Sequence, residues 1–205
     1  MTPVDPETLD AIRELLNIGV GKAAAQLNDM TGHHIRLQVP TVRLLRFTDI
    51  ATDQESVLSR NALSTVRLSF RGAFSGVAAI VFPQESAVSL VMLLTGETEK
   101  TPDLDAMRTE ALKEVGNITL NAVMGSIANV LKTRLTYTIP DYYEGPISAI
   151  HDPDDTTVMD EWVLLARTTF QIESLNIEGD ILLILEVGSL GILGENIEKT
   201  VRDLE

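Results

Sequence analysis

The chain carries the same sequence pattern twice, and the two copies lie one hundred residues apart. The stretch RELLNIGVGKAAAQLNDMTG near the start resembles LKEVGNITLNAVMGSIANVL in the second half. Both copies continue to a proline at the same distance, because Pro40 follows Asn17 by 23 positions and Pro140 follows Asn117 by 23 positions. Two units are too few for a solenoid, so the repeat predicts one domain with internal pseudo-two-fold symmetry.

The later parts of the two units also match, although their offset rises from 100 to about 103 residues. The stretch SGVAAIVFPQESAVSLVMLLTG in the first unit resembles EGDILLILEVGSLGILGENIEKT in the second. We assign the extra residues to the polar loop 151–157 and place the boundary between the units near 97–104. The expected organisation is a single domain over 1–205, with one unit at about 1–100 and the other at about 101–205.

Each unit is expected to contain a long helix, several strands and a short helix. Asp5 suits the N-cap position and Pro6 the first helical turn, so the first long helix should run over about 6–30. Its counterpart should run from about 102 or 105 to about 133. Aliphatic and β-branched runs predict strands at 35–46, 63–71, 76–82, 136–139, 147–150, 161–173 and 180–186, and short helices are expected at 84–95 and 187–202.

Charge and composition exclude several functional classes. A formal net charge of -14 and a pI near 4.5 argue against polyanionic partners, because nucleic acids and anionic lipids are bound chiefly through Lys and Arg. The absence of cysteine excludes disulfides, thiolate metal sites and thiol nucleophiles. The longest apolar runs are shorter than the roughly 20 residues that span a bilayer, and the N-terminus is acidic where a secretory signal would be basic. We therefore expect a cytoplasmic protein that neither binds nucleic acid nor inserts into a membrane.

Each long helix, termed a motif helix, carries polar residues along one face. The positions follow i, i+4, i+7 and i+11, so they fall within about 60° of one another and away from the apolar stripe. These residues are Asp10, Glu14, Asn17 and Gly21 in the first helix, and Glu110, Glu114, Asn117 and Asn121 in the second. A solvated face is normally polar too, but it does not need Glu and Asn at matching places in two copies that have otherwise diverged. Both interpretations are therefore open on the helix pattern alone.

The first motif helix also contains two glycines, Gly19 and Gly21, where stronger helix formers would be expected. Each costs about 1 kcal/mol relative to alanine, so the pair costs roughly 2 kcal/mol. This is a sizeable part of the stability of a typical domain. Either close packing against another backbone or room for an approaching partner should offset the loss.

The two copies resemble the motif of the CheC/CheX/FliY family of chemotaxis phosphatases. That motif reads Asp or Ser, three residues, Glu, two residues, Asn, twenty-two residues and Pro. The first copy, from Asp10 to Pro40, fits at every specified place, and the second departs only at Glu110. CheC proteins are tandem duplications of about this length, whereas CheX is similar to a single unit that dimerises and FliY carries an additional domain. The resemblance therefore implies a CheC-like α+β fold with internal pseudo-two-fold symmetry, a β-sheet core and two long motif helices on the surface.

By this resemblance, the chain would dephosphorylate the phosphoaspartate of a CheY-type response regulator in chemotaxis signalling. Asn17 and Asn117 suit the positioning of the attacking water, because a carboxamide is neutral and offers both an acceptor and donors. Glu14 and Glu114 would contact the active-site lysine of the receiver domain. The other positions of the two faces, which are Asp10, Glu110, Gly21 and Asn121, would support docking.

The resemblance also implies the cofactor and the partners. The receiver domain supplies Mg²⁺, so the chain needs no metal site of its own. The deamidase CheD is a second expected partner, and two motifs within one chain let a monomer present both sites. The competing hypothesis is a non-catalytic signalling adaptor that uses the same helices to bind a receiver domain or CheD without hydrolysis.

Overall fold

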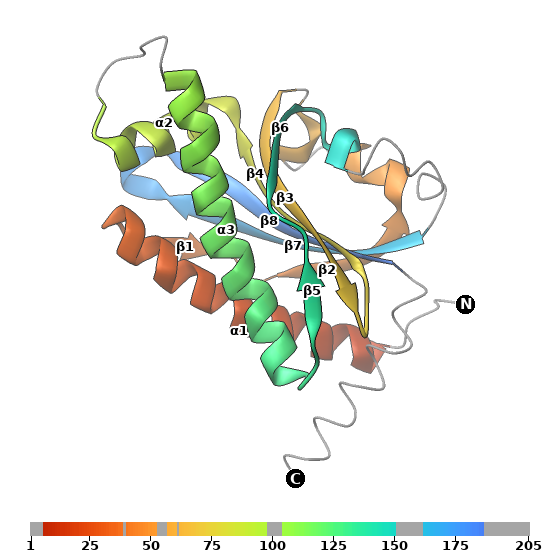
Figure 1. The fold of residues 1–205 in the computed structure, drawn as a ribbon. Coiled ribbons are helices and arrows are strands. Elements are labelled where there is room, and N and C mark those ends of the chain that lie inside the picture. Colours follow the sequence, from red (N-terminus) through yellow and green to blue (C-terminus); the bar gives the residue numbers. More distant parts are fainter. Residues whose placement is uncertain are drawn as a thin grey trace.

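In the part of the chain that the structure describes, three helices pack on one face of an eight-stranded antiparallel sheet (Figure 1). The helices are α1 (Pro6–Thr31), α2 (Gln84–Thr95) and α3 (Leu104–Val130). The expected α+β class, with a sheet core and two long helices at the surface, is confirmed. This computed structural model describes residues 6–38, 40–52, 57–60, 62–97, 104–150 and 162–186.

The strands of both sequence units form one sheet, and the strand order is symmetric with respect to the two units. The first unit provides β1 (Arg36–Leu37), β2 (Thr41–Arg46), β3 (Leu63–Gly72) and β4 (Gly76–Pro83). The second provides β5 (Leu135–Tyr137), β6 (Asp141–Gly145), β7 (Trp162–Ile172) and β8 (Ile177–Glu186). The order is β1-β7-β8-β4-β3-β5, with β2 also paired to β7 and β6 also paired to β3. It reads the same from either edge when the units are exchanged, as a pseudo-two-fold axis between β4 and β8 requires.

Each unit completes the other unit's half of the sheet. The hairpins β3–β4 and β7–β8 join at the centre through the pairing of β4 with β8. The edge strands then cross over, because β1 and β2 pair with β7 whereas β5 and β6 pair with β3. Neither unit forms its half of the sheet from its own strands, while the duplication itself stays an inference from the sequence.

The strand register corrects the place of the extra residues in the second unit. Phe70 lies opposite Gly76 in β3–β4, and Phe170 lies opposite Gly179 in β7–β8. The phenylalanines are thus 100 positions apart and the glycines 103. The assignment to 151–157 is wrong, because the connections that precede β3 and β7 are equally long, at sixteen residues each. The three extra residues lie between Phe170 and Gly179, where the β7–β8 hairpin is longer and its turn forms the short 3₁₀ helix η5 (Glu173–Leu175).

Glycine is needed at both places because a backbone carbonyl oxygen of the neighbouring strand and a phenylalanine ring both lie close. The carbonyl oxygens of Ile184 and Val81 would lie 2.1 Å and 2.8 Å from a Cβ atom at Gly76 and Gly179, respectively. A Cβ atom at Gly76 would lie 2.9 Å from Cζ of Phe70, and one at Gly179 would lie 2.5 Å from Cε1 of Phe170. These separations are well below van der Waals contact, so any side chain at either position would displace the ring. The same packing therefore recurs in both halves of the sheet.

Two of the predicted strands differ from the structure. The predicted strand 147–150 is the 3₁₀ helix η3 (Ile147–Ile150), which brings its two terminal isoleucines, three positions apart, to the same buried side. The strand β6 was not predicted, because its sequence DYYEG is polar and adopts a strand by pairing with β3. The predicted strand 35–46 is split into β1 and β2 near Pro40, whose nitrogen cannot donate to a strand ladder.

The remaining predicted elements are confirmed where the structure describes them. The predicted helix 84–95 coincides with α2, and the strands predicted at 63–71, 76–82, 161–173 and 180–186 correspond to β3, β4, β7 and β8. The strand predicted at 136–139 corresponds to β5 only in part, because β5 ends at Tyr137. The helix α3 ends at Val130 rather than near 133, because a turn follows in which Lys132 has a positive φ of 49°. The N-cap Asp5 and the predicted helix 187–202 lie outside the described residues.

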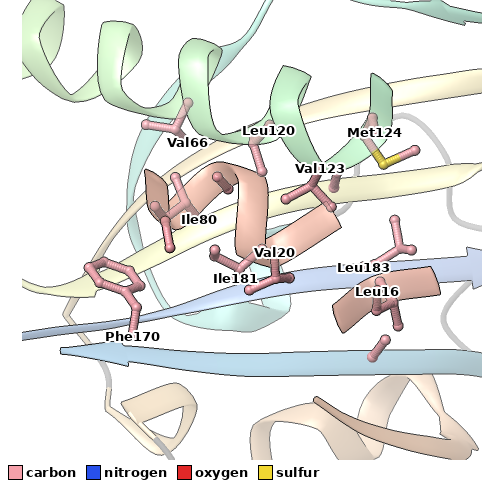
Figure 2. Packing of buried hydrophobic residues seen from close by; sticks show 14 of the residues in the cluster. Leu16, Val20, Val66, Ile80, Leu120, Val123, Met124, Phe170, Ile181 and Leu183 are labelled. Carbon is pink, nitrogen blue, oxygen red and sulfur yellow. The ribbon is translucent and has the colours of Figure 1, made fainter. Parts of the chain in front are cut away.

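The apolar faces of the motif helices pack against the sheet to form the main core (Figure 2). Side chains from both helices interleave with alternate residues of the central strands, which leaves the polar faces outside. The labelled members are Leu16 and Val20 from α1, Leu120, Val123 and Met124 from α3, and Val66, Ile80, Phe170, Ile181 and Leu183 from the strands.

The opposite face of the sheet has its own buried cluster. Ala79 and Val81 of β4 belong to it, whereas their neighbours Ala78 and Ile80 belong to the main core, as alternation along a strand requires. The short 3₁₀ helices η1 (Phe47–Thr52), η2 (Val57–Ser59) and η3 cover this face. Burial on both sides explains why the central strands have continuous apolar sequences.

The two glycines of α1 have different surroundings. Gly19 is buried where α1 crosses α3, and a Cβ atom there would lie 3.0 Å from the carbonyl oxygen of Val123. Gly21 is exposed, and a Cβ atom there would meet nothing within 4 Å. Close helix packing therefore accounts for Gly19. At Gly21 the absence of a side chain leaves open space on the outer face of α1, one turn from Asn17.

We expect Gly19→Ala and Gly21→Ala to change stability in opposite directions. A methyl group at Gly19 presses on a helix carbonyl that cannot move alone, so the free energy of unfolding should fall by about 1 to 2 kcal/mol. At Gly21 alanine gains helix propensity without a clash, so the free energy of unfolding should rise by up to about 1 kcal/mol. Urea denaturation of both variants measures the difference. Stabilisation by both would mean that α1 and α3 separate at no cost.

The exchanged edge strands predict that neither unit folds alone. Residues 1–100 and 101–205, expressed as separate chains, should each lack a cooperative thermal transition as a monomer, because each lacks the strands that close its hairpin. Mixing the two should restore the transition. Circular dichroism combined with size-exclusion chromatography makes the measurement, and a monomeric fragment that melts cooperatively would contradict the prediction.

Candidate functional site

Both motif helices turn their polar faces to solvent. On α1, Asp10, Glu14, Asn17 and Gly21 are all exposed. On α3, Glu110, Glu114 and Asn121 are exposed and Asn117 is half-buried. The apolar residues on the opposite sides of the same helices are buried against the sheet. The structure thus brings each predicted set together on one accessible surface.

A groove of about 560 Å³ runs beside the polar face of α3. One wall is α3 and the other is the segment 137–140, which contains the end of β5 and its connection to β6. The groove brings Pro140 together with Glu114 and Asn117, although Pro140 lies 23 positions beyond Asn117 in the sequence. In the first copy Pro40 is buried, and Val39 beside it lies outside the described residues. The lining residues are Glu110, Lys113, Glu114, Asn117, Asn121, Tyr137, Thr138, Ile139 and Pro140.

The groove wall opposite α3 is held in place by hydrogen bonds to β3. The backbone N–H of Thr138 donates to the carbonyl oxygen of Ser69 at 3.0 Å, and the N–H of Ser69 donates to Oγ1 of Thr138 at 2.9 Å. Ile139 follows directly and is 89% exposed, which is unusual for a large apolar side chain. Tyr137 is 39% exposed, and desolvation by burial raises the pKa of its phenol above the ordinary 10.0, so it stays protonated at neutral pH.

The two copies differ next to the motif asparagine. On α3, Nδ2 of Asn121 donates a hydrogen bond of 2.7 Å to Oδ1 of Asn117. On α1 the corresponding residue is Gly21, which has no side chain to offer Asn17 such a contact. The amide of Asn117 is therefore anchored from its own helix.

A basic residue precedes the motif glutamate in both copies. Arg13 forms an ion pair with Asp10, and Nζ of Lys113 lies 4.0 Å from Oε1 of Glu110. Both pairs join residues three positions apart on an exposed helix surface, where such pairs contribute only a few tenths of a kcal/mol. Among the described residues, neither Glu14 nor Glu114 has an ion-pair partner. The motif glutamates therefore remain available to a cation of another molecule.

Comparison with known proteins shows which proteins this chain resembles. The model of the CheC-like family matches residues 7–44, which contain the first motif helix and the motif proline. The CheY-P phosphatase CheC of Bacillus subtilis (strain 168) is 26% identical over 141 residues, which is 67% of this chain and 66% of that protein. The chain is therefore similar to the CheC/CheX/FliY family, both in its first motif helix and over two thirds of its length.

Solved structures of the family share the fold. FliY of Thermotoga maritima has a TM-score of 0.76 at 21% identity and covers 98% of this chain and 100% of its own. The CheX–CheY–BeF3–Mg complex of Borrelia burgdorferi gives a TM-score of 0.56 at 16% identity and covers 85% of this chain and 99% of its own. At these identities the likeness concerns the fold.

Several residues that line the groove were not predicted from the sequence. Tyr137 and Ile139 were missed because they belong to a short apolar run that resembles a strand, and only their exposure marks them. Lys113 had a usable signal, namely an acid three positions earlier in both copies. Among the described residues, no three His, Asp or Glu side chains gather to hold a metal ion, and no helix there is long and apolar enough to cross a membrane.

Proposed function

We propose that the chain hydrolyses the aspartyl phosphate of a CheY-type response regulator in chemotaxis signalling. The observation that carries the proposal is the groove in which Glu114, Asn117 and Pro140 meet at the surface. The relative from Bacillus subtilis is named a CheY-P phosphatase, and the complex from Borrelia burgdorferi pairs a protein of this fold with CheY. Both support a receiver domain as the substrate.

The reaction needs no covalent bond between the substrate and this chain. A water oxygen bonds to phosphorus while the bond between phosphorus and the acyl oxygen breaks, and its electron pair leaves with the aspartate carboxylate. A water proton passes to the released phosphate. A carboxylate is a good leaving group, so the main requirement is a water held in line with the breaking bond. The neutral amides of Asn17 and Asn117 hold this water without repelling the phosphoryl group.

The motif glutamates act on the partner's cation in this mechanism. A carboxylate close to a phosphoryl group is repelled unless a positive charge lies between them. Glu14 and Glu114 are exposed and have no ion-pair partner among the described residues, so each can bind the receiver's active-site lysine. The receiver also supplies the Mg²⁺ that offsets the phosphoryl charge. Asp10 and Glu110 lie one turn earlier and contact the partner at the rim.

Substitution of the motif asparagines tests hydrolysis directly. With Mg²⁺ present, the wild type should accelerate decay of a phosphorylated CheY-type receiver at least tenfold, which is about 1.4 kcal/mol of barrier. The single variants Asn17→Ala and Asn117→Ala should each lose part of this rate, and the double variant should lose it all. Phosphate release from the purified receiver measures the decay.

Asn129→Ala is a matched control for that experiment. Asn129 is exposed on the same helix as Asn117 but outside the polar face, so its loss should leave the decay rate unchanged. A wild type that binds the receiver without accelerating decay would favour the adaptor hypothesis. A double variant with full activity would remove the asparagines from the mechanism.

Ile139 should anchor the receiver at the second site. In a chain whose first site is disabled by Glu14→Ala, Ile139→Asp should weaken binding of a beryllofluoride-treated receiver at least fivefold, or about 1 kcal/mol. Its 89% exposure means that little packing is lost, so the thermal midpoint should not move. Trp162→Ala is the control, because Trp162 is 49% exposed on β7, in the other half of the sheet. Equal binding by all three chains in calorimetry would exclude this role.

A further inference from the structure

The hydrogen bond between Asn121 and Asn117 determines which way the motif amide faces. Nδ2 of Asn121 donates to Oδ1 of Asn117 at 2.7 Å, so the oxygen of Asn117 points along the helix toward Asn121. The oxygen and nitrogen of an amide diverge from its trigonal carbonyl carbon at about 120°. The NH₂ group of Asn117 therefore points away from Asn121, and Oδ1 keeps a second lone pair for another donor.

The first site lacks this constraint. Asn17 is followed one turn later by Gly21, and a Cβ atom at Gly21 would have open space around it. The amide of Asn17 is thus exposed and has no side chain at that position to select one of its two orientations. A catalytic amide that must present one fixed pattern of donors and acceptors loses rate when it samples the reversed orientation.

We propose that Asn121 is a positioning residue, which holds the amide of Asn117 with its NH₂ group toward the phosphoryl oxygens and its free lone pair toward the attacking water. This inference rests on the proposed phosphatase function. It makes the second site the faster of the two in the chemical step, although the second copy departs from the family motif at Glu110.

A purely structural role for Asn121 would have a different signature. Asn121 is exposed, and one hydrogen bond between side chains four positions apart on a helix surface contributes only about 0.2 to 0.5 kcal/mol to stability. Alanine has a higher helix propensity than asparagine, which offsets the loss. Asn121→Ala should therefore fold as well as the wild type, and any change in kcat arises at the site.

The test uses chains with a single working site. In the Asn17→Ala background, Asn121→Ala should lower kcat three- to tenfold with KM changed less than twofold, and Asn121→Gln, which keeps an amide donor, should recover part of the loss. In the Asn117→Ala background, the reciprocal Gly21→Asn should raise kcat by a similar factor. The substrate is the phosphorylated receiver with Mg²⁺, and thermal midpoints are recorded for every chain.

The outcomes separate this inference from the proposed function. If neither single-site chain accelerates decay, the phosphatase function itself fails. If the Asn17→Ala chain is active and Asn121→Ala keeps its full kcat, the positioning role is overturned while the function stands. A rise in KM at constant kcat would also overturn it, because it would make Asn121 a docking residue. A loss of kcat with partial recovery by Asn121→Gln supports the inference.

Discussion

Backbone pairing between β4 and β8 is the constraint on which the rest of the structure depends. It joins the two hairpins through the register from Gly76↔Leu185 to Val81↔Asp180 and creates one continuous sheet. Both motif helices then cover the same face of that sheet, and their apolar sides have a shared surface to bury. The polar sides must face solvent as a consequence, so the accessibility of both asparagines follows from how the sheet is closed.

The two sites share a scaffold but differ in chemistry. The two helices approach each other closely at Gly19, which lies against the backbone of Val123. The sites differ one helical turn after the motif asparagine, where the first has Gly21 and the second has Asn121. Gly21 offers Asn17 no side-chain partner one turn along the helix, whereas Asn121 anchors Asn117 beside a wall that β3 holds through Thr138. The second copy of the motif thus lies in a groove that holds its asparagine from one side.

The sequence was most informative where one physical cause dominates. Helical periodicity and a repeat of 100 residues placed Glu14, Asn17, Glu114 and Asn117 on the exposed faces of two helices. Long-range pairing was not readable, because β6 becomes a strand only through β3. The place where the repeat offset changes was also not readable, because it is marked by pairs across the strands, Phe70 opposite Gly76 and Phe170 opposite Gly179. The groove could not be predicted because its walls come from different elements and are brought together by folding.

The exchanged edge strands have a consequence for how such a chain could arise. A lone unit with this topology must take its closing strands from a second copy, so its folding depends on the concentration of protein. Joining two copies by a short connection replaces that concentration with an effective one in the millimolar range, whatever the expression level. Two joined units also need not remain identical, whereas copies of one gene product must. Gly21 and Asn121 occupy matching places that this covalent link left free to specialise.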